Sequence, residues 1–577
     1  MVGDSGGGDI ARQSLKQGSH SEKNSFELIK KLLEQKVEST GSADIQTRIN
    51  EAYAFVRNEI ISNSSNPREP VKFGTSGWRG ILGEDVNLRT VACVTQAIVD
   101  MYQTADDGIF GYLGVGSLAE ARERGCVVGH DNRFGREMFG WVVARVLTRN
   151  GFKVLYAGEA TTGALSAAVL MKKAAFSVNL TPSHNPLEYG GYKFNAADGG
   201  PAAAELTYRI TELTSCLLQD GFLFDVMEQD ICDPVQLEGV VRVDALGCWK
   251  SLVRTSREIH QVDLDAIMQS FTGNDDIVVA VDSVHGASRL DITSLFGSYA
   301  GGRLVLLREN DDPTFGGIAP EPSSANIQLV TNVLAQRKEV LKIGAIIDPD
   351  GDRIRFTDGS TEISMNQFGA MVYHFLTVYK KMSGMVAKTV ASSNLANSIA
   401  SVFREEVFES RVGFKEFKPV VGKALVFFEE SDGISIIGHT PEKDAYIGLL
   451  LAMDIVLTTG RNLGDYLAEI ENEFGAYYPD RDGVEVQVKG KELLDRLEQL
   501  EKYDVGSVVS VGSDVMKIEK VIDIDGRKMI FEDGSWLMIR PSGTEPKVRF
   551  YVESRTTEGT SHLVTTAKTM LEEIGLV

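Results

Sequence analysis

A repeated alternation of short apolar runs with amphipathic segments is the feature that most constrains the fold of this chain. Between Phe73 and about Gly200, the strand-like runs CVVGH, KVLYAG and AFSVNL alternate with the helical patterns MFGWVVARVLTRNGF and ALSAAVLMKKA. This order is typical of a mostly parallel sheet with helices on its faces. The rhythm returns from IVVAVDS to IGAIID and again from KTVASS to YIGLLLAMDIVLTTG, where RVGFKEF takes the position of a second strand. The sequence therefore predicts three mixed α/β domains of similar architecture.

The pattern changes at both ends of these repeats. After about Gly460, the strand-like runs MKIEKVIDI, KMIFED, WLMIRP and VRFYVES follow one another between two helical segments, which indicates a smaller α+β domain. Before the repeats, SFELIKKLLEQKVEST and IQTRINEAYAFVRNEII predict two helices of an N-terminal extension. Residues 1–24 are rich in Gly and Ser, and we expect them to be disordered. The predicted units are residues 1–70, 71–205, 206–357, 358–465 and 466–577.

Composition limits the class of protein. Of the 577 residues, 43% are hydrophobic and 24% are charged, and no apolar run approaches the ~20 residues that a membrane span needs. The N-terminal sequence MVGDSGGGDIARQS lacks the apolar core of a signal peptide, and five scattered cysteines without a CxxC pair suit a reducing compartment. We therefore expect a soluble cytoplasmic protein, monomeric or dimeric, with no membrane partner. The formal charge of −22 argues against a nucleic-acid partner.

A polar turn after the third apolar run presents a candidate nucleophile. In AAFSVNLTPSHNP, Pro182 and Pro186 stiffen the backbone on both sides of Ser183, and neighbouring side chains offer hydrogen-bonding groups to its hydroxyl. Ten residues further on, Lys193 follows a Gly-Gly pair. Turns also favour Ser, Asn and Pro for local reasons, so the motif alone does not establish a catalytic role.

The run IIDPDGDRIR predicts a metal site. Asp348, Asp350 and Asp352 lie at i, i+2 and i+4, which in an extended loop points three carboxylates to one side. Oxygen ligands alone select a hard cation, and we expect Mg²⁺. A surface acidic turn is the alternative. An EF-hand is excluded because its sixth and twelfth positions hold Arg353 and Gly359 instead of Gly and Glu.

The run IRPSGTEPKVRFY has the composition of a phosphate clamp. Backbone amides at a glycine turn, two hydroxyls and three cations suit a phosphate dianion, because arginine can pair with it through two parallel hydrogen bonds. A charged hairpin edge is the alternative. The residues concerned are Arg540, Ser542, Gly543, Thr544, Lys547 and Arg549.

Three further polar segments supply weaker signals. KFGTSGWRG holds Thr75, Ser76 and Arg79, and GHDNRFGR adds Arg133. FFEESDGISIIGHTPEKDAY offers carboxylate and hydroxyl groups of the kind that bind sugar hydroxyls, namely Glu429, Ser431, His439, Lys443 and Asp444. If the cations of these turns meet in space, an acidic protein carries a cationic pocket, and such a pocket suits an anionic small substrate.

Together these groups indicate phosphoryl transfer on a phosphosugar. The chain offers a hydroxyl nucleophile, a metal loop, a phosphate clamp and sugar-binding groups. It has no Walker A loop and no kinase catalytic loop to bind ATP, so a phosphate held on the enzyme itself is the economical source.

With these motifs in place, the sequence resembles the α-D-phosphohexomutase superfamily, and most closely its phosphoglucomutase and phosphomannomutase branch. FGTSGWRG is similar to the opening FGTSGxRG, TPSHNP to the phosphoserine loop TASHNP, and DPDGDR to the metal loop DGDGDR. The EES of FFEESDG resembles the sugar loop GExSG, and RPSGTEP the phosphate loop RxSGTEP. The resemblance extends from Phe73 to the C-terminus, with five motifs in the family's order.

The resemblance implies four domains around a central cleft and a mutase that interconverts hexose 1-phosphate and hexose 6-phosphate. Ser183 would carry the phosphoryl group, and Mg²⁺ would contact it and the three aspartates. A hexose 1,6-bisphosphate would be intermediate and activator, with glucose the favoured sugar and mannose a second. Lys193, His184 and Arg79 would form the acid/base set, with the pKa of Lys193 lowered by neighbouring cations. The implied substrate-binding residues are Thr75, Ser76, Arg133, Arg353, Glu429, Ser431, Lys443, Arg540, Ser542, Gly543, Thr544 and Arg549.

Three departures from the family pattern leave the sugar open. Pro182 replaces the usual Ala, Gly190 stands where Asn is common, and Phe428 stands where the sugar loop has Gly. Phosphoglucosamine mutase is the alternative within the family. A metal-dependent sugar phosphatase that uses the same serine, or an inactive binding protein on the same fold, are alternatives of other classes.

Overall fold

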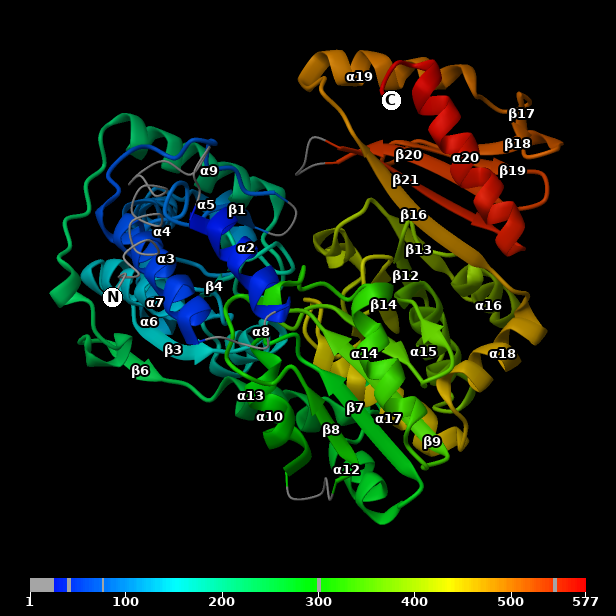
Figure 1. Cartoon of the computed structure of the whole chain (residues 1–577), viewed down its shortest axis with the longest axis horizontal. Helices are drawn as coiled ribbons and strands as arrows, with labels where there is room; N and C mark the ends of the chain where they lie inside the picture. Colours follow the sequence, from blue (N-terminus) through cyan, green and yellow to red (C-terminus); the bar gives the residue numbers. More distant parts are fainter. Residues whose placement is uncertain (1–24, 39–42, 75–76, 298–301, 543–546) are drawn as a thin grey trace, which may run out of the picture.

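The computed structural model describes residues 25–38, 43–74, 77–297, 302–542 and 547–577 (Figure 1). Four β-sheets, each with its own helices, follow one another along the chain, and the last stands apart at the C-terminal end (Figure 1). The α/β class with a C-terminal α+β domain is therefore confirmed. The predicted disorder of residues 1–24 lies outside the described residues.

The first sheet has six strands in the order β1-β5-β4-β2-β3-β6. Its centre is parallel, and β5 pairs antiparallel with both β4 and β1 at one edge. The strands are β1 (Trp78–Ile81), β2 (Cys126–His130), β3 (Val154–Glu159), β4 (Phe176–Leu180), β5 (Tyr189–Asn195) and β6 (Val240–Arg242). The helices are α4 (Leu88–Gln103), α5 (Asp107–Leu113), α6 (Leu118–Arg124), α7 (Arg136–Arg149), α8 (Thr162–Lys172) and α9 (Ala204–Gln219). Ser183 follows the carboxyl end of β4, as predicted.

The second sheet has the order β11-β10-β9-β7-β8. Its strands are β7 (Ile277–Asp282), β8 (Leu304–Leu307), β9 (Leu341–Ile347), β10 (Ile354–Thr357) and β11 (Glu362–Ile363). Its helices are α10 (Ala245–Thr255), α11 (Arg257–His260), α12 (Leu264–Gly273), α13 (Ser288–Phe296) and α14 (Ser324–Ala335). The three aspartates occupy the turn that joins β9 to its antiparallel partner β10.

The third sheet has the order β13-β12-β14-β15. Its elements are β12 (Val386–Thr389), β13 (Val407–Ser410), β14 (Val426–Glu429), β15 (Gly433–Ile436), α15 (Met365–Val378), α16 (Leu395–Phe403), α17 (Ala445–Thr459) and α18 (Leu463–Phe474). The strand expected at RVGFKEF is wrong. The strand ends at Ser410, and Phe414–Val420 forms a 3₁₀ helix because Phe414 and Phe417, three residues apart, both pack on Phe427.

The fourth sheet is antiparallel and has the order β16-β21-β20-β19-β18-β17. Its elements are β16 (Tyr478–Glu485), β17 (Val508–Val511), β18 (Asp514–Ile522), β19 (Arg527–Phe531), β20 (Trp536–Pro541), β21 (Lys547–Ser554), α19 (Gly490–Glu498) and α20 (Thr557–Glu573). This domain has a hydrophobic core of its own. A small apolar cluster, which includes Val390 and Trp536, joins it to the third domain.

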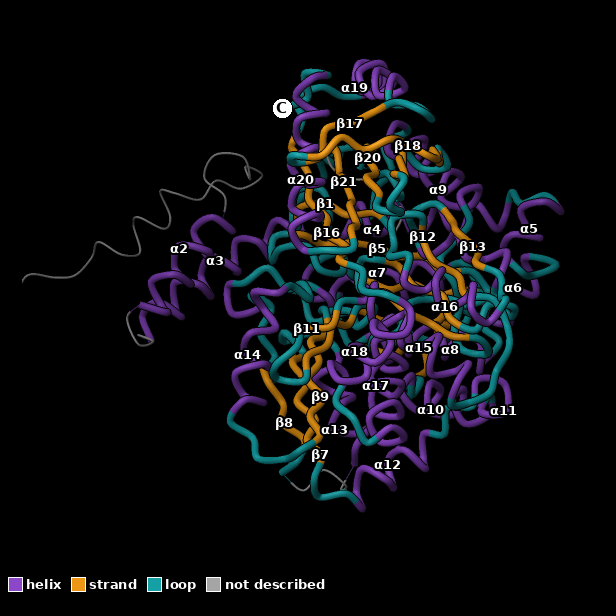
Figure 2. The backbone as a smooth tube through the Cα atoms, turned by 90° about the vertical axis from the view of Figure 1, so that its right-hand side faces the viewer, coloured by secondary structure: helices purple, strands orange, loops and turns teal. Residues whose placement is uncertain are grey.

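The two predicted N-terminal helices form an antiparallel hairpin on the outside of the first domain, α2 (Ser25–Glu38) and α3 (Ala43–Ser62) (Figures 1 and 2). Buried residues of both helices, among them Phe26, Ile29 and Val56, belong to the same hydrophobic cluster as the first domain. The hairpin is therefore integrated into that domain's core.

The domain boundaries remain predictions. In the first domain, α9 packs on α4 and β6 pairs with β3, although both lie at or beyond residue 204. Their position favours a boundary later than residue 205. No single described helix is long and apolar enough to cross a membrane; only α17 and α18 together pass on length and composition, and they meet at 77°.

Candidate active site

The serine turn, which we define as residues 181–188 between β4 and β5, holds the hydroxyl of Ser183 against the turn that carries the three aspartates. Ser183 is 1% exposed and adopts a left-handed φ of 59°, which is uncommon for a residue with a side chain. Its Oγ donates a hydrogen bond of 2.8 Å to Asp348 Oδ2, and its amide donates to Thr181 Oγ1 at 2.8 Å. Behind the turn, a Cβ atom on Gly191 would come within 2.4 Å of the Thr181 carbonyl, so this close approach requires glycine.

Arg133 holds the backbone of the same turn. Its guanidinium donates to the carbonyl oxygens of Ser183 at 2.7 Å and Pro186 at 2.6 Å, and also to that of Asn185. It is 4% exposed and does not line the cleft described below. The structure therefore places Arg133 as support for the serine turn, in contrast to the substrate contact expected from sequence.

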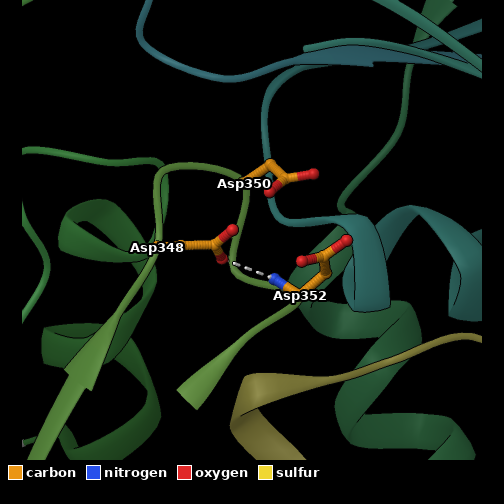
Figure 3. A group of neighbouring side chains, drawn as sticks. All are labelled: Asp348, Asp350 and Asp352. Carbon is orange, nitrogen blue, oxygen red and sulfur yellow. Dashed lines mark hydrogen bonds between the residues drawn. The ribbon is translucent and has the colours of Figure 1, made fainter. Parts of the chain in front are cut away.

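The three aspartates of the metal loop turn their carboxylates toward one another (Figure 3). All three are at most 1% exposed, and one oxygen from each lies within 4.8 Å of the others. Asp348 Oδ1 accepts from the amides of Asp352 and Arg353, each at 3.0 Å, which orients the loop. Within the described residues, Oδ1 of Asp350 and Oδ1 of Asp352 accept no hydrogen bond although they are buried. A cluster of carboxylates with unused buried oxygens fits a hard divalent cation.

The charges of this loop depend on Lys193. Its Nζ donates to Asp350 Oδ2 at 2.5 Å and to Asp352 Oδ2 at 2.7 Å. Burial alone would lower the pKa of Lys193, but these carboxylates raise it above its usual value. The expected lowering is therefore wrong in this structure, because anions lie closer to the amine than cations do. Burial and the two neighbouring carboxylates raise the pKa of Asp348 well above its usual range.

A cleft with a volume of about 490 Å³ opens beside this cluster, lined by residues of all four domains. The predicted residues in its wall are Arg79, His184, Lys193, Asp352, Arg353, Glu429, Ser431, Lys443, Arg540, Ser542, Lys547 and Arg549. Thr75, Ser76, Gly543 and Thr544 lie outside the described residues. Ser183, Asp348 and Asp350 are buried and take no part in the wall.

His184 lies in this wall, where its surroundings favour the neutral form of its imidazole. Its Nδ1 lies 3.5 Å from Glu321 Oε2. Burial, with Arg353 and Arg79 nearby, lowers the pKa of His184 to about 3. A neutral imidazole can offer a hydrogen bond to a ligand without adding a charge.

Lys443 links Glu429, a predicted sugar-binding residue, to the turn that carries the three aspartates. Lys443 Nζ lies 3.3 Å from Glu429 Oε1 and 3.4 Å from Asp352 Oδ2. Glu429 ends β14, and successive strand residues point to opposite faces. Phe428 is therefore directed into the core, where it is fully buried against Gly369. This departure from the family pattern does not alter the wall of the cleft.

The other departures also lie outside the wall. A Cβ atom on Gly190 would come within 2.7 Å of Leu82 and 2.9 Å of Val86, so close packing against the segment that follows β1 explains the glycine. Pro182 is buried in the serine turn.

Several charged residues of the wall were missed by the sequence analysis, among them Glu321, Glu430, Glu442 and Arg481. Glu442 accepts from Asn195 Nδ2 at 3.1 Å, and burial raises its pKa to about 7. Glu430 accepts from Thr389 Oγ1 at 2.7 Å. Both acidic residues adjoin predicted ones, Glu429 and Lys443, so a search of motif neighbours could have found them.

On the fourth domain, Arg540 and Arg549 occupy opposite positions on adjacent strands β20 and β21. Arg540 Nε lies 3.1 Å from Asp525 Oδ2. Two cations side by side at the end of a hairpin, with Lys547 and Ser542 next to them, form an anion-binding edge.

A buried serine beside three carboxylates, next to a cleft between four domains that several arginine and lysine side chains line, is an arrangement that suits a phosphoryl-transfer enzyme. Residues 70–216, 257–361 and 364–474 match the families described as phosphoglucomutase/phosphomannomutase alpha/beta/alpha domains I, II and III, and residues 484–566 match the C-terminal domain of the same family. The chain belongs to the phosphoglucomutase/phosphomannomutase family, within the α-D-phosphohexomutase superfamily, and is a mutase acting on hexose phosphates.

The relatives differ in the sugar that they are named for. A phosphoglucomutase of Komagataeibacter xylinus is 27% identical over 84% of this chain and 87% of its own length. A phosphoglucosamine/phosphogalactosamine mutase of Sulfurisphaera tokodaii is 24% identical over 87% of this chain and 99% of its own. The open form of a Paramecium phosphoglucomutase, pp63/parafusin, shares the fold, with a TM-score of 0.68 and 21% identity over 89% of this chain and 96% of that one.

Proposed function

We propose that this protein interconverts hexose 1-phosphates and hexose 6-phosphates, with glucose phosphates as preferred substrates, through a phosphate carried on Ser183. The observation that carries the proposal is the hydrogen bond of 2.8 Å between Ser183 Oγ and Asp348, inside a carboxylate cluster that borders the cleft. The buried donor set supports Mg²⁺ held by Asp348, Asp350 and Asp352 together with the serine oxygen. When bound, that ion neutralises the charge of the phosphoryl group.

In the first half-reaction, the free hydroxyl of the bound sugar attacks the phosphorus of phospho-Ser183. The bond between phosphorus and Ser183 Oγ breaks, and a hexose 1,6-bisphosphate forms. Lys193, which holds its proton beside Asp350 and Asp352, gives a proton to Oγ and recovers one from the attacking hydroxyl. The guanidinium groups of Arg79 and Arg353 stabilise the transferring charge, and neutral His184 offers a hydrogen bond.

In the second half-reaction, the bisphosphate lies in the opposite orientation and returns its other phosphate to Ser183. Glu429 and Ser431 hold the sugar hydroxyls in both orientations, supported by Lys443. The phosphate that does not react is held by Arg540, Ser542 and Arg549, and by Gly543 and Thr544 of the same loop. Binding at both ends of the substrate explains why one cleft serves both isomers.

The test is an assay of purified protein with Mg²⁺, glucose 1-phosphate and a trace of glucose 1,6-bisphosphate. Formation of glucose 6-phosphate supports the mutase. Release of inorganic phosphate instead would identify a phosphatase, and sugar binding without turnover would identify an inactive binding protein. Intact mass before and after Ser183→Ala tests the carrier, and a phosphate adduct that survives the substitution would overturn the assignment.

A second candidate substrate is an amino sugar, glucosamine 1-phosphate. The observation that favours it is the second buried carboxylate beside Glu429, that of Glu430, in the wall of the cleft. A carboxylate can pair with the ammonium group of an amino sugar, whereas a neutral hydroxyl gains less from it. Comparing kcat/KM for glucose, mannose and glucosamine 1-phosphates decides between them.

A further inference from the structure

The N-terminal hairpin contacts the serine turn by two routes. The hairpin, α2 with α3, lies before residue 70, where the match to the family's first domain begins. It forms an outer layer on the first domain (Figures 1 and 2). Its contacts nevertheless reach the segment that carries Ser183.

The direct route is an ion pair. Lys30 Nζ, on α2, donates a hydrogen bond of 2.7 Å to Glu188 Oε1. Glu188 lies in the serine turn, its side chain is 14% exposed, and its carbonyl accepts from the Leu82 amide at 2.9 Å. Solvent and salt screen an ion pair with a mostly buried member less than they screen a fully exposed one.

The indirect route runs through the second domain. Leu33, on α2, lies against Gly317 in the 3₁₀ turn Phe315–Gly317. Phe315 is fully buried, and the guanidinium carbon of Arg133 lies 4.8 Å from the centre of its ring. Arg133 in turn holds the carbonyls of the serine turn, as described above. Phe134, which follows Arg133 in the sequence, packs on Tyr53 of α3 with ring centres 4.4 Å apart.

The serine turn needs such support. Ser183 is held at a left-handed φ, a conformation that costs energy for a residue other than glycine. Its carbonyl and those of Asn185 and Pro186 all accept hydrogen bonds from Arg133, so a displacement of this one side chain would remove three of the contacts that hold the turn.

We propose that the α2–α3 hairpin is a positioning element for the serine turn, with Lys30 as a positioning residue that acts through Glu188. The proposal rests on the phosphate-carrier role of Ser183 proposed above. It assigns a part in the reaction to a segment that lies outside the matched family domains. Lys30 touches no reacting atom, and its effect is on how narrowly the phosphate donor is oriented.

The first experiment measures amide hydrogen exchange over residues 181–192 in the full chain. Lys30→Met removes the charge and keeps a long, unbranched side chain. We expect the amides of this segment, which include that of Ser183 in the turn and that of Tyr189 at the start of β5, to exchange roughly threefold to tenfold faster than in the wild type. Lys31→Met, at the neighbouring exposed position on α2, is the matched control and should leave exchange unchanged.

The second experiment measures steady-state kinetics of the same variants with glucose 1-phosphate and Mg²⁺. Lys30→Met should lower kcat roughly threefold to tenfold and leave KM within about twofold, because the substrate-binding residues lie on other elements. Lys30→Arg should restore kcat, since it keeps the charge. Phe315→Leu removes the ring beneath Arg133 and tests the indirect route. Like Lys30→Met, it should speed amide exchange and lower kcat.

If the amides of Lys30→Met exchanged at the wild-type rate, the proposed effect of the Lys30–Glu188 contact on the turn would be overturned. If exchange were faster but kcat unchanged, the positioning role would be overturned. A loss of kcat shared by Lys31→Met, or one that Lys30→Arg fails to restore, would also overturn it. Failure of the carrier hypothesis looks different. In that case wild-type protein shows no phosphate on Ser183 and no mutase activity, while the exchange comparison still tests the contact.

Discussion

The two sides of the cleft are built in different ways. The catalytic floor, which we define as Ser183, Asp348, Asp350 and Asp352, is at most 1% exposed. It spans the first and second domains, and the Thr162 amide ties them by donating to the Asp350 carbonyl at 2.8 Å. The C-terminal wall, Arg540, Ser542 and Arg549, is half-buried and belongs to a domain with its own core. We infer that the floor determines the chemical step and that the wall determines how firmly a phosphate is held.

The largest effect is expected from Ser183→Ala on the floor. Loss of the phosphate carrier should lower kcat by about a thousandfold or more. The variant should fold normally, because alanine removes one hydroxyl from a buried site without adding bulk. Mutase assays with thermal unfolding as the control measure both quantities. Substantial turnover by a folded Ser183→Ala variant would show that the floor does not determine the chemical step through this serine.

Asp352→Asn on the floor should lower kcat by roughly a hundredfold, because a proposed metal ligand and a partner of Lys193 are lost together. The wild type should lose activity in a chelator and regain it with Mg²⁺. The matched control is Asp276→Asn, at an exposed position of the same domain. Full activity in the presence of chelator would contradict the metal site.

A smaller and different effect is expected at the C-terminal wall. Arg540→Met removes a charged phosphate contact, so KM should rise by roughly tenfold to a hundredfold with kcat within about threefold. Lys520→Met, exposed on β18 of the same domain, should match the wild type. If kcat fell by as large a factor as KM rose, Arg540 would take part in the chemical step, and the proposed difference between the floor and the wall would be wrong.

The smallest effect is expected at the joint between the third and fourth domains, and it is an effect on the pH dependence of stability. Lys528 is 1% exposed and donates to the Val390 carbonyl at 2.7 Å, and burial lowers its pKa to about 7. Between pH 7 and the ordinary lysine value, the unfolded chain binds more protons at this site than the folded one. The stability contributed by this residue therefore rises as the pH rises through that range.

Thermal unfolding at pH 6.5 and at pH 9 measures this effect. Relative to Lys528→Met, the wild type should gain stability between the two pH values. Equal pH profiles for the two proteins would contradict the lowered pKa of this amine.

The floor could be predicted from sequence because each of its motifs is short and sits where a strand ends. Ser183 follows β4, and the three aspartates follow β9, so alternation and strand order bring them together. The fold was predictable for a similar reason, since the β-α rhythm is a local property of the chain. The failure at RVGFKEF is local as well, because an aromatic pair three residues apart suits a 3₁₀ helix better than a strand.

The remaining parts of the site depend on distances between segments that are far apart in sequence. The role of Arg133 follows from three carbonyls that lie about fifty residues later in the chain. The raised pKa of Lys193 follows from carboxylates of another domain. The ion pair of Lys30 with Glu188 spans 158 residues, and no pattern around either residue indicates it. Such contacts require three-dimensional packing, which residue spacing alone does not supply.

Asp432, next to the proposed sugar-binding residue Ser431, shows that such contacts between distant segments extend across three domains. It has a φ of 71° and is 2% exposed, its carboxylate accepts from Arg355 at 2.8 Å, and Arg481 lies 3.8 Å away. Arg355 belongs to the second domain and Arg481 to the fourth, so one carboxylate in the third domain is shared by its two neighbours. The loop that we propose to bind the sugar is thus held by contacts from three domains at once. We infer that substitutions at these interfaces, far from any ligand, can change the sugar preference of the site.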